Sequence, residues 1–457
     1  MQNHLSLLNQ WAQSSPSLLA LNTPAKDYTW LELEQEVLTI ASGLQQQGVQ
    51  SGDVVTCVGK NSPESVVLFL ACLEVGATCA LTMPQTLAEL EVKLDTIYLP
   101  NQTKRIWLSG SDESLTSLQT IQYQGYNPKK LVRAYHLDSL ASIVFTSGST
   151  GVPKAVAHTS RQHLASAMGL LERFHFRQTN TWLLSLPMYH VSGLAIVYRW
   201  LYSGATMKVG SGDLRTDIQG VTHASLVATQ LKRLLDCDSK LNLSHVLLGG
   251  SHVPQSLSLQ AAAKGIETWL GYGMTEAAST VTAKPVDGKY SAGFVLSKRE
   301  VKLEGSRIFI GGETLASGYY YQGTLSPIAV DGWFDSKDLG EWQDGELKII
   351  GRADNQFISG GENIHCEEIE VVLNQLEAVQ QSIVVPVKDV DFGYRPVAVL
   401  QCDSLPNQSD IETILESQLT KFKWPIAYFR MPTELVTGGI KVSRQNIRQW
   451  LEKEIDK

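Results

Sequence analysis

The stretch from Thr146 to Lys154, with the sequence TSGSTGVPK, combines residue types that can hold a polyphosphate. Its glycines allow backbone N–H groups to approach an anion closely, its hydroxyls add donors, and Lys154 adds a mobile positive charge. An apolar run at 140–145 leads into the stretch and predicts a buried strand. Pro153 stands five positions after Gly148, where a Walker A loop has its second glycine, so the loop is of another kind. Taken alone, the stretch is also compatible with a flexible surface turn.

A second group of residues, GYGMTE at 271–276, follows an apolar strand-like run at 267–270. Its glycines allow a flat ligand to lie against the backbone, and Tyr272 offers a face on which a ring can stack. Glu276 supplies a hard oxygen ligand of the kind that Mg²⁺ prefers. The alternative for this motif in isolation is a tight turn that ends in a surface glutamate.

Three further positions carry polar groups that suit a nucleotide. The two carboxylate oxygens of Asp338 can accept hydrogen bonds from a vicinal diol. Arg352 and Asp354 are two residues apart, and in isolation such a pair is most often a surface ion pair. Lys441 follows a pair of glycines and precedes a helix that Ser443 can cap, which predicts a lysine on a projecting loop. An exposed lysine is otherwise only a solvated charge.

These motifs, in this order from residue 146 to 443, resemble those of the adenylate-forming enzymes, which include acyl-CoA synthetases, luciferases and the adenylation domains of peptide synthetases. The resemblance covers essentially the whole chain. It implies ATP and Mg²⁺ as ligands and coenzyme A as a co-substrate. The chain departs from the usual Thr-Gly-Asp text of the family at Ser336 and Lys337, which weakens the transfer of a role to Asp338.

The resemblance also implies a role for individual residues. Lys441, Thr146 and Glu276 are expected to be catalytic, with Glu276 holding the metal and Lys441 reaching the substrate carboxylate and the α-phosphate. Asp354 is expected to be the pivot of a hinge. The residues expected to bind ATP or AMP are Thr146, Ser147, Gly148, Ser149, Thr150, Gly151, Lys154, Gly249, Gly250, Gly271, Tyr272, Gly273, Thr275, Asp338 and Arg352.

The stretch 186–209 lies where this family builds its acyl pocket, and it contains His190, Ser192 and Arg199. A guanidinium in an apolar pocket is costly unless it is paired. An arginine between aromatic neighbours suits a ring that bears a carboxylate, because guanidinium binds carboxylate through two parallel hydrogen bonds. We therefore expect these three residues to bind an aromatic dicarboxylic acid. The alternative is that Arg199 faces solvent.

Two other functions remain open at this stage beside an aryl-CoA ligase. An adenylation domain that loads a carrier protein would form the same adenylate without using coenzyme A. A nucleotide-binding protein without catalysis belongs to a different class, and the presence of Glu276 and Lys441 argues against it.

Composition narrows the class of protein further. The chain has 457 residues, 43% of them hydrophobic and 18% charged, with a net charge of −8, which argues against nonspecific binding to nucleic acid. Its six cysteines include no C-x-x-C pair, so they suggest neither a zinc site nor a disulfide framework, which fits a reducing cytoplasm. The longest apolar stretch, 66–83, contains Glu74 and Gly76, so we expect a buried helix followed by a core strand, with no membrane insertion. A homo-oligomer is compatible with all of these features.

Strand-like runs alternate with helical periodicity, which predicts an α/β fold. We expect a large N-terminal domain with several sheets at 1–351 and a small, mobile α+β domain at 352–457 that carries Lys441. Expected helices include 31–47, 61–73, one that begins at a capping Ser160, and a terminal one that begins after Ser443.

Overall fold

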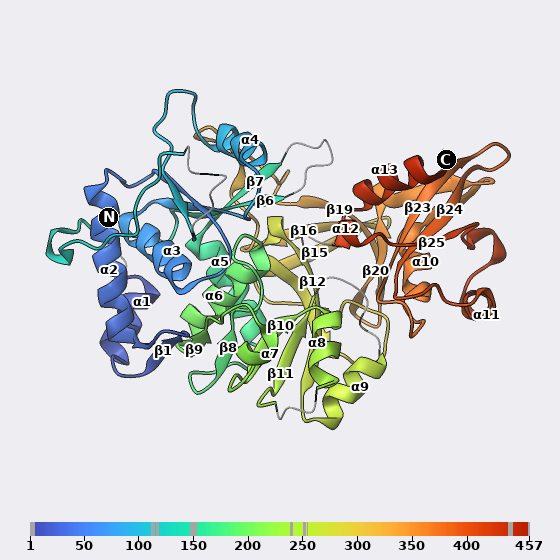
Figure 1. The fold of residues 1–457 in the computed structure, drawn as a ribbon, viewed down its shortest axis with the longest axis horizontal. Coiled ribbons are helices and arrows are strands. Elements are labelled where there is room, and N and C mark those ends of the chain that lie inside the picture. Colours follow the sequence, from blue (N-terminus) through green and yellow to red (C-terminus); the bar gives the residue numbers. More distant parts are fainter. Residues whose placement is uncertain are drawn as a thin grey trace.

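The computed structural model of the chain describes residues 5–110, 115, 118–146, 153–237, 241–249, 253, 255–436 and 442–455. These residues form β-sheets with helices packed against them, and the C-terminal part lies to one side of the rest, at the right of Figure 1. The α/β fold expected from the sequence is confirmed.

The first sheet has a parallel centre and antiparallel strands at both ends, in the order β14-β13-β12-β11-β10-β8-β9-β1-β2. Its strands are β1 (Leu19–Asn22), β2 (Asp27–Thr29), β8 (Thr181–Leu183), β9 (Thr206–Lys208), β10 (His223–Leu226), β11 (His245–Leu248), β12 (Glu267–Met274), β13 (Ser279–Pro285) and β14 (Phe294–Val295).

The second sheet has the order β18-β17-β7-β6-β4-β3-β5, with β7 antiparallel to both β6 and β17. Its strands are β3 (Val54–Val58), β4 (Thr78–Thr82), β5 (Ile106–Leu108), β6 (Leu140–Thr146), β7 (Lys154–Thr159), β17 (Gly318–Tyr321) and β18 (Thr324–Ser326). The antiparallel sheet that follows consists of β15 (Arg299–Glu304), β16 (Arg307–Gly312), β19 (Phe334–Gln343) and β20 (Glu346–Arg352).

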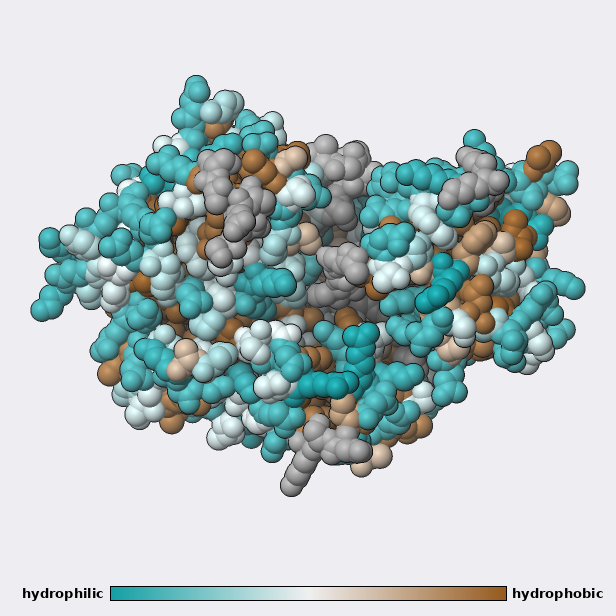
Figure 2. All heavy atoms as spheres, viewed as in Figure 1, coloured by the Kyte–Doolittle hydropathy of each residue, from teal (hydrophilic) through white to brown (hydrophobic). Residues whose placement is uncertain are grey.

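The last sheet belongs to the C-terminal part of the chain. Its strands are β21 (Gln356–Ser359), β22 (Glu362–His365), β23 (Gln381–Asp389), β24 (Gly393–Gln401) and β25 (Tyr428–Arg430). Figure 2 shows hydrophobic side chains gathered over the hairpin of β23 and β24, where Phe392 and Val390 are exposed.

The helices are α1 (Leu7–Ser14), α2 (Trp30–Gln46), α3 (Pro63–Val75), α4 (Leu87–Ile97), α5 (Ser160–Leu171), α6 (Val191–Ser203), α7 (Leu214–Asp217), α8 (Ala228–Leu235), α9 (Gln255–Ala263), α10 (Cys366–Leu373), α11 (Gln408–Gln418), α12 (Thr433–Val436) and α13 (Arg444–Ile455). Most of them lie between these strands in the sequence, while α1 precedes β1 and both α12 and α13 follow β25.

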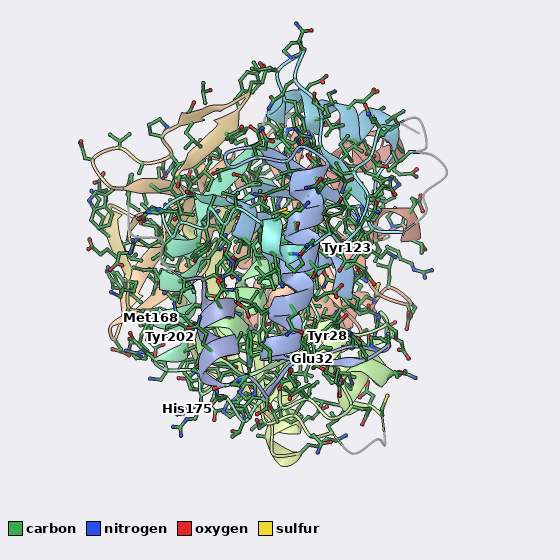
Figure 3. The ribbon with its side chains drawn as sticks, turned by 90° about the vertical axis from the view of Figure 1, so that its left-hand side faces the viewer. Tyr28, Glu32, Tyr123, Met168, His175 and Tyr202 are labelled. Atoms are coloured by element: carbon green, nitrogen blue, oxygen red, sulfur yellow. The ribbon has the colours of Figure 1, made fainter. Side chains whose placement is uncertain are left out.

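Capping residues explain where several helices begin. The Thr29 hydroxyl accepts from the backbone N–H of Glu32, and the Glu32 carboxylate accepts from the backbone N–H of Thr29, so two of the free backbone donors at the start of α2 are satisfied. Glu32 is visible at this end of α2, which lies beside α1 (Figure 3). The side chain that caps α5 belongs to Thr159, not to Ser160 as expected. Ser160 is already helical, and its hydroxyl lies 3.1 Å from the Tyr198 hydroxyl in the core.

The apolar stretch at 66–83 is the end of α3 followed by β4, as expected, and every residue of β4 is buried. Within the described residues, no helix has the length and apolar character needed to cross a membrane. The hydrophobic clusters divide along the chain: some contain only residues up to Ile349, and the others only residues from Phe357 onward. The chain therefore has separate cores on the two sides of the 350–356 segment.

Candidate active site

The ends of the expected phosphate loop lie opposite each other. β6 and β7 pair antiparallel, and in this register Thr146 is the partner of Lys154. Ser147, Gly148, Ser149, Thr150 and Gly151 lie outside the described residues. The structure thus positions the two anchoring residues of the loop at the same end of the second sheet.

The second motif differs from expectation because the strand does not stop at Leu270. β12 continues to Met274, since β13 returns antiparallel beside it and supplies hydrogen-bond partners. The pairing shifts register between Tyr272 and Gly273, and a Cβ at Gly273 would overlap the carbonyl oxygen of Ser279. Only glycine therefore fits this close approach of the two strands.

A short 3₁₀ turn, η3 (Thr275–Ala277), follows β12 and presents Glu276. The next two residues, Ala278 and Ser279, have φ values of 51° and 91°, in the left-handed region that non-glycine residues rarely adopt. The Ser166 hydroxyl on α5 donates to the Ala278 carbonyl at 2.5 Å and helps to hold this bend. Strained backbone next to a motif is typical of functional sites.

Glu276 and Lys154 meet through a residue that the sequence reasoning missed. The Tyr319 hydroxyl on β17 donates to Glu276 Oε1 at 3.1 Å, and Lys154 Nζ lies 4.8 Å from the centre of the Tyr319 ring. Tyr319 stands among three consecutive tyrosines, and nothing in that local sequence distinguishes it. Only the pairing of β17 with β7 brings it between the two motifs.

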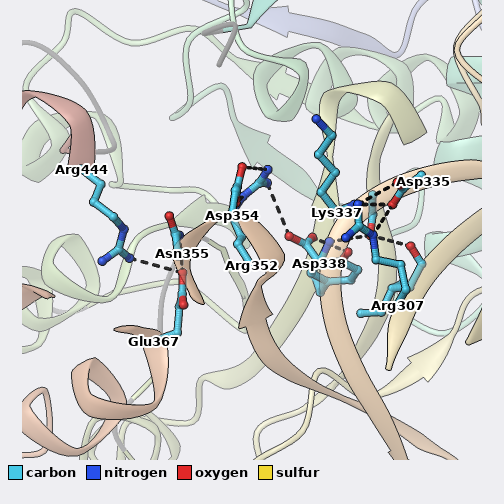
Figure 4. A network of polar contacts seen from close by, with 12 residues as sticks. Arg307, Asp335, Lys337, Asp338, Arg352, Asp354, Asn355, Glu367 and Arg444 are labelled. Atoms are coloured by element: carbon cyan, nitrogen blue, oxygen red, sulfur yellow. Dashed lines mark hydrogen bonds and ion pairs between the residues drawn. The ribbon is translucent and has the colours of Figure 1, made fainter. Parts of the chain in front are cut away.

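Three of the expected nucleotide-binding residues form one cluster. The Tyr272 hydroxyl donates to Asp338 Oδ2 at 2.6 Å. Arg352 Nη1 lies 3.4 Å from Asp338 Oδ1 (Figure 4). Burial, and then the neighbouring Asp338 carboxylate, raise the pKa of Tyr272, so its hydroxyl stays protonated as a donor. The structure thus joins residues from β12, β19 and β20 at one place.

At Lys337 the chain departs from the usual family sequence, and the lysine has to adopt an unfavourable backbone conformation there. Lys337 has a φ of 61°, a conformation that glycine adopts more readily. Its backbone N–H donates to Asp335 Oδ1, and the next N–H, that of Asp338, donates to the Ser336 hydroxyl at 3.0 Å. These two hydrogen bonds hold the bulged strand and keep Asp338 in place despite the lysine.

The expected hinge pair forms a double hydrogen bond. Arg352 donates from Nε and Nη2 to the two oxygens of Asp354, at 2.8 and 3.0 Å. This bond raises the pKa of Arg352 and lowers the pKa of Asp354, so both stay charged. Beyond it, Glu367 Oε1 accepts from Asn355 and from Arg444, as Figure 4 shows.

Arg444 anchors the start of α13, three residues after Lys441. It donates to the Glu370 carboxylate on α10 and to the Val384 carbonyl on β23. Lys441 and its preceding glycines lie outside the described residues. The structure therefore gives the anchor of the lysine loop, while the place of Lys441 itself stays an expectation.

The expected acyl-binding residues all belong to α6 or its start. His190 is the residue before α6, Ser192 lies in its first turn and is partly exposed, and Arg199 lies seven residues later on the same face. Arg199 is only 2% exposed, so the alternative in which it faces solvent is wrong. Its guanidinium lies 5.4 Å from the Trp182 ring rather than on its sequence neighbours.

Arg199 is a buried cation with few hydrogen-bond acceptors to offset the loss of water around its charge. Its Nη2 donates to the Thr280 hydroxyl at 3.2 Å, and its Nε has no hydrogen-bond partner among the residues that the structure describes. Burial, and then the positive charge of nearby Arg299, lower the pKa of Arg199 to about 9. Thr280 also connects the two arginines, because its carbonyl accepts from Arg299 Nε at 2.9 Å.

Within the described ranges, neither Arg199 nor Arg299 has a carboxylate within 4 Å. A pair of buried guanidinium groups without an anion is unfavourable unless a ligand supplies one. Of the two guanidinium groups, Arg299 already donates to several acceptors, whereas Arg199 Nε remains without one among the described residues and could donate to an anion.

The donor set suits magnesium bound together with phosphates. Glu276 accepts one hydrogen bond within the described part of the chain, from Tyr319 to Oε1, which leaves Oε2 as a possible metal ligand. The described residues contain no group of three or more His, Cys, Asp or Glu that could hold a metal alone. Mg²⁺ typically takes one or two carboxylates and completes its shell with substrate phosphates and water, so a single glutamate fits.

Gly249, expected to bind the nucleotide, follows β11 directly and is exposed, with space around its Cα. Its neighbour Gly250 lies outside the described residues. Gly271 lies within β12, and Thr275 begins the turn that presents Glu276. Their roles stay expectations.

Comparison with known proteins identifies the class to which this arrangement belongs. The profile of a family described as AMP-binding enzyme matches residues 8–94 and 91–320. The chain belongs to this family of AMP-binding enzymes, as the resemblance of its motifs implied.

Relatives along the whole chain are more specific. The 2-succinylbenzoate–CoA ligase of Salmonella typhimurium (strain LT2) is 41% identical over 447 residues, which cover 96% of each chain. That of Escherichia coli (strain K12) is 40% identical over 450 residues, which cover 97% of this chain and 98% of its own.

Solved structures agree in fold. An arginine-to-lysine variant of E. coli MenE with bound OSB-AMS has a TM-score of 0.90 at 38% identity and covers 99% of this chain and 100% of its own. O-succinylbenzoate coenzyme A synthetase (MenE) from Bacillus subtilis, in complex with ATP and magnesium ion, has a TM-score of 0.83 at 26% identity. It covers 93% of this chain and 95% of its own.

Proposed function

We propose that the chain is an AMP-forming ligase that converts 2-succinylbenzoate to 2-succinylbenzoyl-CoA, a step of menaquinone biosynthesis. The relatives named for this reaction match almost the full length of the chain. The observation that carries the choice of substrate is Arg199, a buried guanidinium with an unpartnered Nε in the described residues. 2-Succinylbenzoate has two carboxylates, so one can react while the other pairs with this cation.

In the first half-reaction, the succinyl carboxylate attacks the α-phosphorus of ATP and pyrophosphate leaves, giving the acyl-adenylate. Negative charge builds on the phosphoryl oxygens, so positioned donors and cations stabilise the transition state. Thr146 and Lys154, at the two ends of the phosphate loop, act on the phosphates, and Lys441 is expected to act between the carboxylate and the α-phosphate. Mg²⁺, held by Glu276 together with the phosphates, would neutralise part of the same charge.

The adenosine moiety is expected to bind at the cluster of Tyr272, Asp338 and Arg352. The ring of Tyr272 is fixed by its hydroxyl bond to Asp338, which leaves the ring face to stack on adenine. Asp338 is 7% exposed, and carboxylate oxygens are acceptors of the kind that ribose hydroxyls need. The partly exposed Arg352 borders the same place.

In the second half-reaction, the thiol of coenzyme A attacks the acyl carbonyl, loses its proton, and AMP leaves. No protein nucleophile is required for either step. The residues from about 352 onward are proposed to rotate as a body between the two half-reactions, with Asp354 as pivot. The separate hydrophobic cores on the two sides of the 350–356 segment support this motion.

The enzyme is proposed to act in the cytoplasm on small-molecule substrates. Its six cysteines, all within the described residues, are free thiols, and five of them are buried. Free, scattered thiols fit a reducing compartment.

A thioester-formation assay across a panel of acids tests the proposal. We expect ATP- and CoA-dependent turnover of 2-succinylbenzoate, with at least tenfold lower kcat/KM for 4-oxo-4-phenylbutanoate, which lacks the ring carboxylate. Equal use of both acids would leave only a general acyl-CoA ligase. Adenylate formation without CoA-dependent turnover would instead indicate a domain that loads a carrier protein.

A further inference from the structure

Tyr319 lies between two motifs that the sequence separates by 122 positions, Lys154 and Glu276. Its strand, β17, pairs antiparallel with β7, and Tyr319 is the register partner of Val156. The segment before it is tied to both motifs: the Ala316 N–H donates to the Glu276 carbonyl at 2.8 Å, and the Ser317 N–H donates to the Ala157 carbonyl at 2.9 Å. Tyr319 is therefore held in place by backbone hydrogen bonds that do not depend on its own side chain.

The side chain makes two polar contacts of different kinds. Its hydroxyl donates to Glu276 Oε1 at 3.1 Å, and this is the one hydrogen bond of the Glu276 carboxylate among the described residues. Its ring faces Lys154 Nζ at 4.8 Å, within the range of a cation–π contact. The hydroxyl orients one carboxylate oxygen and leaves the other available, while the ring limits where the ammonium can go.

We propose that Tyr319 is a positioning residue that orients Glu276 toward the metal–triphosphate complex and holds Lys154 beside it. This inference rests on the proposed function, because it takes Glu276 to be the residue that holds the metal. Groups that hydrogen-bond to a metal ligand fix its orientation, and their loss typically weakens metal affinity by about tenfold to a hundredfold. The two contacts of Tyr319 should be separable, since one needs the hydroxyl and the other needs only the ring.

Tyr319→Phe removes the hydroxyl and keeps the ring. Binding of Mn²⁺ to the enzyme–ATP complex, followed by electron paramagnetic resonance without any acid substrate, should become about tenfold weaker. In ATP–pyrophosphate exchange with 2-succinylbenzoate, the Mg²⁺ concentration for half-maximal rate should rise by a similar factor, and saturating Mg²⁺ should restore most of the rate. Tyr321→Phe is the matched control, because Tyr321 lies on the same strand with its side chain 56% exposed, and it should behave as the native enzyme.

Tyr319→Leu removes the ring as well. At saturating Mg²⁺ it should show an additional rise in KM for ATP of about two- to fivefold, as expected for a lost cation–π contact at a partly exposed site. If Tyr319→Phe shifts the metal dependence no more than Tyr321→Phe, or loses activity that Mg²⁺ does not restore, the positioning role is wrong.

Glu276→Gln distinguishes an error in the role of Tyr319 from an error in the proposed function itself. If Glu276→Gln binds Mn²⁺ as the native enzyme does, Glu276 is not the metal ligand and the proposed mechanism needs revision. If Glu276→Gln loses the metal but Tyr319→Phe does not, only the role of Tyr319 is overturned. In the Glu276→Gln background, Tyr319→Phe should add less than a twofold further effect, because its target is already gone.

Discussion

Replacing Arg199 with methionine should stabilise the fold while it impairs the use of 2-succinylbenzoate. The guanidinium is 2% exposed and has one hydrogen bond among the described residues, to the Thr280 hydroxyl. Methionine fills a similar length of space without a charge. Replacing an unfavourable buried charge with an apolar side chain of similar volume commonly stabilises proteins by about 1–4 kcal/mol.

The size of this cost can be bounded from the pKa. Burial and the nearby Arg299 charge lower the pKa of Arg199 from 12.5 to about 9. At about 1.4 kcal/mol per pH unit, the charged form costs the native state at most roughly 5 kcal/mol. At Arg199 the unfolded state binds more protons between these two pKa values, so the contribution of Arg199 to native stability should rise with pH from about 9 to 12.5. Below pH 9 the full cost applies. Arg199→Met should lack the contribution of Arg199 to this dependence and keep that of Arg299, whose pKa burial also lowers to about 9.

Thermal unfolding without substrate, at pH 7.5 and at pH 10, measures the stability change. We expect the melting temperature of Arg199→Met at pH 7.5 to exceed that of the native protein by roughly 2–5 °C. The excess should shrink at pH 10. The kcat/KM for 2-succinylbenzoate should fall about ten- to a hundredfold, as for the loss of a charged hydrogen bond of roughly 1.5–3 kcal/mol. The KM for ATP should stay near its native value.

Arg299→Met is the matched control, because Arg299 is also buried but fully bonded. Its guanidinium donates to the carbonyls of Thr280, Ala165, Ser297 and Ser166 and to the Ser166 hydroxyl. Removing it leaves these acceptors unsatisfied, so this variant should lose stability. The reasoning is refuted if Arg199→Met is as destabilised as Arg299→Met, or if it retains native kcat/KM for 2-succinylbenzoate.

Other substitutions test separate parts of the site. Asp338→Ala should weaken ATP binding about ten- to a hundredfold, and an unchanged dissociation constant by calorimetry would argue against ribose contact. Lys441→Ala should slow adenylation by about 10²–10³ but spare thioester formation from synthetic acyl-AMP and CoA; equal losses would mean that its role is misassigned. Lys337→Gly should increase the free energy of unfolding by roughly 0.5–1 kcal/mol, because the φ of 61° at this position suits glycine. The midpoint of urea unfolding should therefore rise, and a lower midpoint would contradict this. Arg444→Met should destabilise the C-terminal core by about 3 kcal/mol or more, since it leaves buried Glu370 unpaired; unchanged proteolytic resistance of that part would contradict this.

Much of the fold could be predicted because its signals are local. Apolar periodicity predicted α2 and α3 to within a few residues, and the apolar run at 140–145 predicted β6. One failure arose where a partner strand decided the outcome. β12 continues through Gly271–Met274 because β13 pairs with it. The residues of one segment do not reveal which strand will pair with it, so the end of β12 could not be predicted from 267–276 alone.

The sequence by itself determined the family, because nine ordered positions at 146–154, followed downstream by further motifs in the family's order, are too specific a pattern to arise by chance. It also singled out Arg199, since a guanidinium within an apolar stretch is costly enough to need a reason. Only the tertiary structure decided that Arg199 is buried beside Arg299 at Thr280, and that Tyr319 lies between Lys154 and Glu276. Those contacts depend on which strands pair and in which register. Long-range packing determines the pairing and the register, and local residue patterns do not predict them.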